Sequence, residues 1–318
     1  MAEDALNPNH LFGHVQDATH FDVPRKFSQD GKGHIFLPQP FAKPKLGADG
    51  KQVVNEHGEP QYVSLWQVKT ENPMIKQIIL PINLTFTKFM AIEVVVALII
   101  CGLFLGLAAK IRSGGAPKGR LWNMLEAFLF YLRDQVALPC IGAHDVNRFV
   151  PIVWSVFFFV LGCNLMGMLP WVGSPTASLA VTAALAMVTF ITVLGAGMAR
   201  LGFWGFWKAQ VPHMDLPKPV AVFLIPMIFV IEIFGLLVKH FVLAVRLLAN
   251  MIGGHVVLAV LLAFITMTAS SFLFWGVMPA SVLGATLLSL LELLVAFIQA
   301  YIFAFLTALF IGMAVHPH

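Results

Sequence analysis

Ionisable residues interrupt two long apolar stretches in the last hundred residues of the chain, among them Glu232, Lys239, Arg246, His255 and Glu292. Glutamate and histidine can exchange protons near neutral pH in a suitable environment, whereas arginine stays protonated at any physiological pH. A charged side chain in the middle of a membrane costs at least about 2.5–3.5 kcal/mol. These residues are therefore candidates for function, and the chemistry that they offer is proton transfer.

The spacing of the first three residues predicts that they share one helix face. Glu232, Lys239 and Arg246 are seven residues apart, and a straight helix drifts by only about 20° over each such step. Asn250 follows Arg246 by one turn and stays close to the same face.

His255 is predicted to point away from that face. It lies nine residues after Arg246, which is roughly 180° around the helix. Glu292 and Gln299, in the second apolar stretch, are again seven residues apart and share a face. A contact between His255 and Glu292 would give each buried group a partner and would make a proton-exchanging pair.

Long cationic side chains have a second interpretation, because they can extend to the membrane surface. For Lys239 the two interpretations stay open. Arg246 lies deep within the apolar segment 241–252 with no acidic residue one turn away, which favours a functional role. A permanent cation repels protons, so it would divide a proton path into two half-paths. A mobile carboxylate from a partner, ionised beside Arg246 and protonated against lipid, would connect them.

The composition requires a membrane environment around most of the chain. Of the 318 residues, 58% are hydrophobic and 11% are charged, against roughly 25% charged in soluble domains. The basic residues are scattered singly, which argues against a nucleic-acid partner. His10 and His14 are four residues apart but have no Cys or Glu at a matching distance, so we expect surface histidines and no metal or cofactor.

The charges divide the chain into two parts. Residues 1–88 hold nine Lys/Arg and nine Asp/Glu, and the other 230 residues hold eleven and seven. We therefore predict a polar N-terminal tail over 1–88, with a short strand near Gln61–Val68, and a membrane domain over 89–318. No signal or transit peptide is visible, so the first apolar segment is expected to direct insertion itself.

The membrane domain is predicted to contain one N-terminal span, an interfacial helix and a transmembrane hairpin. Their expected bounds are Phe89–Ala109, Leu121–Leu138, and Phe149–Trp171 with Thr176–Ala199. A span needs about 20 apolar residues. The loop after the first span is purely basic, with Lys110, Arg112, Lys118 and Arg120, and is expected on the cytoplasmic side, which puts the tail outside.

The last part of the chain is predicted to form two long, strongly tilted helices. Val220–Ala263 has 44 residues without a loop signal and would be about 66 Å long as a helix, twice the hydrocarbon thickness. Residues 280–315 repeat the pattern, and the turn is expected over Thr266–Pro279. The fold class is therefore all-α integral membrane, with a tilted hairpin over about 220–315.

Three motifs in this frame resemble subunit a of F-type ATP synthases, over about residues 85–315. They are Arg246-Leu-Leu-Ala-Asn250-Met-Ile-Gly-Gly-His255, Glu292-Leu-Leu-Val-Ala-Phe-Ile-Gln299-Ala-Tyr-Ile-Phe and Cys163-Asn164-Leu-Met-Gly-Met-Leu-Pro170. The family's fold also has two long tilted helices. Many bacterial members carry Glu on the first of them and His on the second, whereas this chain has the reverse order, as mitochondrial members do.

The resemblance implies a role for each candidate residue. Arg246 matches the stator arginine that faces the carboxylates of the rotating c-ring. His255 and Glu292 match the pair in the half-channel open to the side of high proton concentration, with Asn250 and Gln299 beside them. Two further polar residues are implied near the path: Glu232 on the exit side, and Asn164 in the hairpin.

The implied function is that of the proton-translocating stator subunit of the Fo sector, which couples proton flow to ring rotation and ATP synthesis. The implied partners are the c-ring, the peripheral-stalk subunit b, the F1 sector through the stalk, and the lipid bilayer. The chain has no GxxxxGK[ST] loop, so it is not expected to make ATP itself. A bacterial inner membrane is favoured, a mitochondrial one stays open, and so does the choice between H⁺ and Na⁺.

Two other classes of protein fit the sequence less well. An ion-coupled secondary transporter would show repeated halves, and no internal repeat is apparent in the sequence. A structural membrane anchor would tolerate loss of Arg246, whereas a proton path would not.

Overall fold

The computed structural model describes residues 17–22, 34–40, 42–45, 52–54, 61–64, 86–112, 119–169, 172–209 and 218–316. The helical elements are α4 (Lys88–Arg112), α5 (Arg120–Tyr131), the π-helix η2 (Leu132–Ala137), α6 (Leu138–Ile141), α7 (Val146–Gly167), the 3₁₀-helix η3 (Pro175–Ala177), α8 (Leu179–Leu201), α9 (Phe203–Ala209), α10 (Lys218–Thr268) and α11 (Phe274–Val315). Within the described ranges, five helices are long and apolar enough to cross a membrane: α4, α7, α8, α10 and α11. The predicted all-α integral membrane class is thus confirmed.

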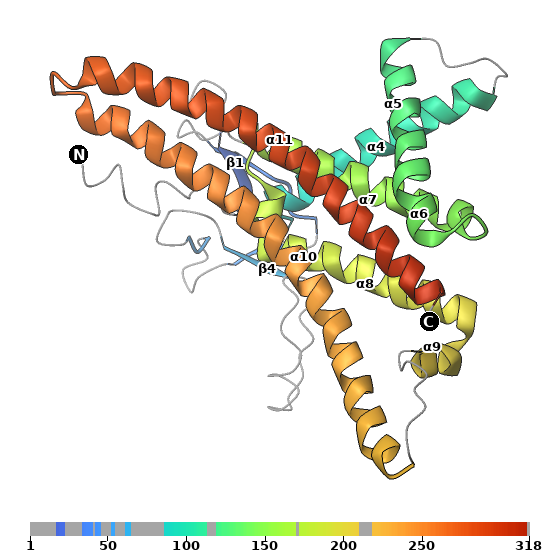
Figure 1. Cartoon of the computed structure of the whole chain (residues 1–318). Coiled ribbons are helices and arrows are strands. Elements are labelled where there is room, and N and C mark those ends of the chain that lie inside the picture. Colours follow the sequence, from blue (N-terminus) through green and yellow to red (C-terminus); the bar gives the residue numbers. More distant parts are fainter. Residues whose placement is uncertain are drawn as a thin grey trace.

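The two longest helices, α10 and α11, form a hairpin whose arms lie side by side from their turn and diverge toward the C-terminal end of α11 (Figure 1). With 51 residues, α10 has a length of about 77 Å. Its first turns run on beyond the end of α11, away from the rest of the bundle (Figure 1).

The turn of this hairpin is shorter than predicted. Helix α10 continues to Thr268 and α11 begins at Phe274, so only residues 269–273 lie between them. The polar residues at the end of α10 stay helical because their hydroxyls bond back to their own helix: Thr268 Oγ1 donates to the Phe264 carbonyl over 2.8 Å. Pro279 lies in the second turn of α11, where it removes only one backbone hydrogen bond.

The hairpin rests on α7 and α8, which cross behind it (Figure 1). These four helices share one hydrophobic core, which includes Val153, Phe157 and Val160 of α7, Val193 and Ala196 of α8, Leu243 and Leu247 of α10, and Phe303, Ala308 and Ile311 of α11. Helix α4 packs on the other side of α7, where Gly162 lets Val96 come close. The polar residues of α10 and α11 are therefore held on a packed scaffold.

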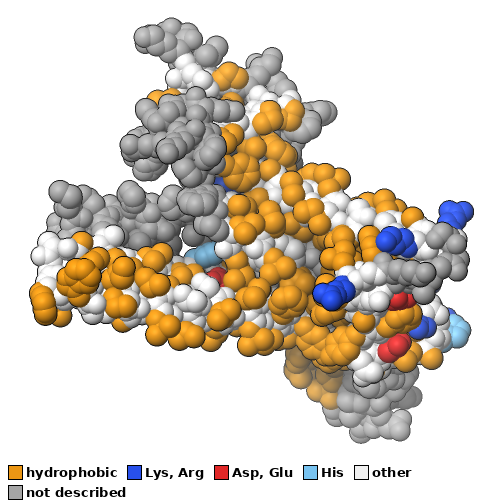
Figure 2. Space-filling model, turned by 90° about the horizontal axis from the view of Figure 1, so that it is seen from above, with side chains coloured by type: hydrophobic (Ala, Val, Ile, Leu, Met, Phe, Trp, Pro, Cys, Tyr) orange, Lys and Arg blue, Asp and Glu red, His pale blue; other side chains and the backbone are white. Residues whose placement is uncertain are grey.

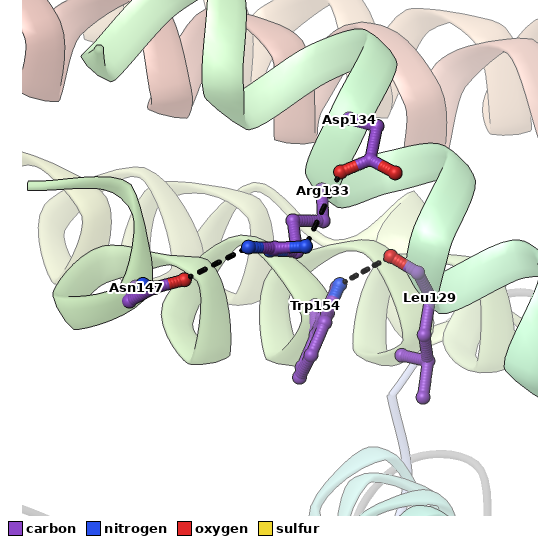
Figure 3. Close-up of polar contacts among 5 residues, drawn as sticks. All are labelled: Leu129, Arg133, Asp134, Asn147 and Trp154. Atoms are coloured by element: carbon purple, nitrogen blue, oxygen red, sulfur yellow. Dashed lines mark hydrogen bonds and ion pairs between the residues drawn. The ribbon is translucent and has the colours of Figure 1, made fainter. Parts of the chain in front are cut away.

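The segment predicted as one interfacial helix is interrupted by the π-helix η2, and polar contacts fix it on α7 (Figure 3). The wider π-turn disturbs the regular hydrogen bonding of the helix. The indole nitrogen of Trp154 donates to the Leu129 carbonyl over 3.0 Å, close to this junction. Arg133 donates to the Asn147 side chain over 3.3 Å and also contacts Asp134.

The described parts of the N-terminal tail form short strands that pair as β1 (His20–Asp22) with β2 (His34–Phe36), and β3 (Ala42–Pro44) with β4 (Tyr62–Ser64), both antiparallel. Strand β4 lies within the segment predicted to hold a strand. The Gln39 side chain exchanges two hydrogen bonds of 2.8 Å with the backbone of Phe86, which ties the tail to the start of α4. His10 and His14 lie outside the described residues.

Positive charges gather at one end of the membrane spans. On the face shown in Figure 2, the blue side chains lie at one end and apolar side chains cover most of the remaining described surface. Basic residues stand where α4 and α8 end and where α5 and α7 begin: Lys110, Arg112, Arg200, Arg120 and Arg148. The connections at the opposite end, 172–178 and 269–273, hold no charged residue.

Candidate functional site

The structure brings His255 and Glu292 together between the two long helices. His255 Nδ1 in α10 lies 3.9 Å from Glu292 Oε1 in α11, and the two side chains are 18% and 7% exposed. This distance is too long for a hydrogen bond but suits an ion pair or a bridging water. Two polar atoms of the pair, His255 Nε2 and Glu292 Oε1, are buried without a hydrogen-bond partner among the described residues.

A glycine makes room for this pair. A Cβ atom on Gly254 would lie 2.6 Å from Glu292 Oε1, so any side chain there would push the carboxylate aside. A Cβ on the neighbouring Gly253 would meet nothing within 4 Å. Gly254 was not among the residues predicted to form the site, although two consecutive glycines inside a helix indicate a close approach.

Amide side chains extend the site along the helix interface. Asn250 Nδ2 donates to Gln299 Oε1 over 2.8 Å, and Asn164 Nδ2 of α7 donates to the Ala296 carbonyl of α11 over 3.4 Å. Asn164 and Gln299 are almost fully buried, at 1% and 3% exposure. Three helices therefore each contribute at least one amide to the same region.

These residues surround a small cavity with room for about one water molecule. Its lining is formed by Asn164, Leu247, Asn250, Met251, Glu292, Val295, Ala296 and Gln299. Three lining atoms are buried without a hydrogen-bond partner among the described residues: Asn164 Oδ1, Gln299 Nε2 and Glu292 Oε1. Two are acceptors when Glu292 is ionised and one is a donor, so one water molecule could satisfy all three.

Arg246 of α10 is not among the residues that line the cavity, although Asn250, one turn further along the helix, is. Arg246 is half-buried, and none of the ion pairs among the described residues includes it. Glu232 and Lys239 are exposed on α10. The structure therefore does not bring Glu232 to the cavity. Large apolar side chains of α10 are exposed around these residues, among them Phe234, Leu237, Phe241 and Val242.

An acidic residue that was not predicted from the sequence, Asp145, connects the start of α7 with the end of α11 on the basic side. Asp145 Oδ1 lies 3.2 Å from His144 Nδ1, and Asp145 Oδ2 lies 3.4 Å from His316 Nε2, just after α11. Burial alone would raise the pKa of Asp145, but the hydrogen bond with His144 and the charges of Arg200 and His316 outweigh it and lower the pKa. No periodic signal connects residues so far apart in the chain.

The fold and the site define a multi-pass α-helical membrane protein with acid–base groups placed inside its membrane-spanning part. A model of the ATP synthase A chain family matches residues 90–312. The chain belongs to this family, that of ATP synthase subunit a, the proton-translocating membrane subunit of the Fo sector, which has no catalytic activity alone.

Individual relatives agree with this assignment. The chain is 38% identical over 240 residues to ATP synthase subunit a of Myxococcus xanthus, covering 74% of this chain and 76% of the relative. It is 41% identical over 237 residues to the Rhodopseudomonas palustris subunit a, covering 74% and 90%. With Anaeromyxobacter dehalogenans subunit a, the identity is 40% over 213 residues, which is 66% of this chain and 53% of the relative.

Proposed function

We propose that this chain forms two offset proton half-channels beside the c-ring, separated by Arg246. The observation that supports this most is the division of polar groups on one helix. His255 of α10 faces Glu292 of α11, whereas Arg246 neither lines the cavity beside Glu292 nor has an ion pair among the described residues.

The first half-channel is the region around the cavity. Glu292 takes up a proton from the outer side, with His255 as its exchange partner 3.9 Å away. The proton then passes the hydrogen-bonded amides Asn250 and Gln299, and Asn164 holds water at the cavity. From there the proton moves to a carboxylate of the ring.

Arg246 keeps the two half-channels apart. A guanidinium stays protonated, so it cannot relay a proton, and it repels one electrostatically. A ring carboxylate that comes beside Arg246 is held ionised and must release its proton first. Glu232 lies fourteen residues earlier on α10, about 21 Å along the helix, and serves the exit half-channel.

The exposed apolar face of α10 around Arg246 is the surface that meets the c-ring. The peripheral-stalk subunit b and, through it, the F1 sector are the other protein partners, and lipid covers the remaining apolar surface. The basic helix ends support a cytoplasmic position for the loop after α4, in a bacterial inner membrane. The tail over 1–88 then lies outside.

The test is Arg246→Ala in membranes that carry the whole complex, with ATP-driven proton pumping and ATP synthesis as readouts. We expect a complex that assembles, shown by co-purification of the ring subunit, but neither pumps nor synthesises. Lys239→Ala is the matched control, because it removes an exposed cation from the same helix. Coupled activity in Arg246→Ala, or equal loss in both variants, would refute the proposal.

A further inference from the structure

The connection between α7 and α8 contains a buried hydroxyl pair that the roles above do not use. Ser174 and Thr176 are both 0% exposed, and their hydroxyl oxygens are 3.1 Å apart. The other buried threonines, Thr182, Thr189 and Thr307, donate to carbonyls of their own or the preceding turn. The Ser174–Thr176 hydrogen bond uses one of two hydroxyl hydrogens, so the other remains available to a further acceptor.

Capping of the short helix η3 does not account for this pair. Ser174 occupies the N-cap position of η3, yet its side chain makes no capping hydrogen bond. Two hydroxyls have thus been buried in a membrane protein without the local backbone role that Ser and Thr commonly have in turns.

The pair lies next to the cavity that holds Glu292. Gly167 follows Asn164 by three residues on the same face of α7. A Cβ atom on Gly167 would lie 2.5 Å from Ser174 Oγ and 2.9 Å from Met251 Cε. Met251 is 3% exposed and lines the cavity. Its side chain therefore touches the cavity with one part and reaches the Ser174 hydroxyl region with its methyl group.

We propose that Ser174 and Thr176 form the outer station of the proton route to Glu292, and that Met251 is a movable barrier between this station and the cavity. This inference rests on the proposed function. The connection 172–178 lies at the end of the spans opposite the basic helix ends, which is the outer side.

The chemistry needs no co-reactant. A hydroxyl oxygen accepts a proton from an outer water while the same group releases its own proton to the next acceptor, so each hydroxyl is unchanged after transfer. Methionine is unbranched and has three rotatable bonds, so it can move aside and return. When it is in place, its apolar end interrupts the water chain between the hydroxyls and Glu292.

The first experiment measures passive proton conduction through membrane vesicles stripped of F1, driven by a potassium diffusion potential. We expect the double variant Ser174→Ala/Thr176→Val to conduct at least about fivefold more slowly, which corresponds to about 1 kcal/mol. Thr189→Val is the matched control, since its hydroxyl is buried but donates to the Ala186 carbonyl. Conduction like the parent in the double variant, or an equal loss in the control, would overturn the inference.

A second measurement does not depend on a hydroxyl-free connection folding normally. Ser174→Cys is made in a chain whose Cys101, Cys140 and Cys163 have been replaced, and right-side-out vesicles receive a small membrane-impermeant thiol reagent. We expect modification from the outside and a loss of conduction that follows it. If the introduced thiol stays unmodified while the complex conducts normally, this route is not used.

Met251 has its own test in the same vesicles. Met251→Phe fills the space between the two hydroxyls and the cavity and should slow proton conduction. Met251→Ala opens this space and should preserve or increase the rate of conduction. A Met251→Phe variant that conducts like the parent removes the barrier role. Glu292→Gln distinguishes failure of the proposed function from failure of the outer station. If this variant conducts normally, the proposed function itself fails; if it does not conduct, only the outer station remains in question.

Discussion

Asn250 donates a hydrogen bond of 2.8 Å to Gln299, so one amide pair joins the two long helices beside Glu292. Replacing Asn250 by Leu leaves Gln299 Oε1 without its donor. Gln299 is only 3% exposed, and an unsatisfied buried polar group costs about 1–3 kcal/mol. We expect the initial rate of ATP-driven proton pumping to fall about tenfold. Gln299→Leu should have a similar effect, and the double variant should be less impaired than the two separate losses combined. Independent, fully additive losses would contradict coupling between the two amides.

The glycine pair before His255 provides a sharper comparison. Gly254→Ala puts a methyl group 2.6 Å from Glu292 Oε1 and should displace the carboxylate from His255, whereas Gly253→Ala meets no atom within 4 Å. Both variants gain the same small increase in helix propensity. We expect passive proton conduction to drop at least about tenfold in Gly254→Ala, equal to about 1.4 kcal/mol, and to stay unchanged in Gly253→Ala. Equal rates in the two would mean that Glu292 does not need its observed position.

Asp145 should make the stability of the folded subunit depend on pH in the acidic range. Its pKa is lowered in the folded protein, so the ionised form stabilises the fold, fully above the unfolded pKa of about 4 and progressively less as the pH falls through the folded pKa. Asp145→Asn should lower the melting temperature of the solubilised subunit at pH 7, and the difference from the parent should shrink below about pH 4. A pH-independent difference would show that the carboxylate charge is not the cause.

The close contact between α6 and α11 leads to a prediction about the stability of the subunit. A Cβ atom on Gly312 would collide with the backbone carbonyl oxygen of Cys140, which cannot move without shifting α6. Gly312→Ala should therefore destabilise the subunit by at least about 1–3 kcal/mol, as overpacking does, and lower its amount in the membrane. Gly235→Ala, where the added atom meets nothing within 4 Å, is the control. Normal amounts of the Gly312→Ala subunit, measured by immunoblot, would argue against this contact.

The long apolar runs made the helices predictable, because a membrane span depends on length and composition alone. Spacing also predicts that His255 and Arg246 face different surroundings. Spacing within each helix does not fix the contact between His255 and Glu292. The register between the two helices depends on packing around Gly254, which neither helix sequence specifies alone. The roles of the site residues come from the resemblance and remain predictions.

Other features depend on contacts that no local pattern encodes. The π-helix η2 interrupts a segment whose composition suggested one continuous helix, next to the indole of Trp154. Asp145 and His316 are 171 residues apart and meet only because the ends of the spans are adjacent. The predicted end of α10 is too early because Thr268 is typical of a turn, although its hydroxyl is satisfied within the helix.

The length of α10 has a geometric consequence for anything that moves along it. A helix of about 77 Å in a hydrocarbon layer of about 30 Å must run obliquely. Two residues at different depths on such a tilted helix also lie at different lateral positions in the membrane. His255 and Glu232, 23 residues apart on this helix, are thus displaced sideways as well as vertically. If a carrier loads at one and unloads at the other, as proposed, it has to move sideways within the membrane plane, and the slope of a single helix would then convert a transverse gradient into sideways motion.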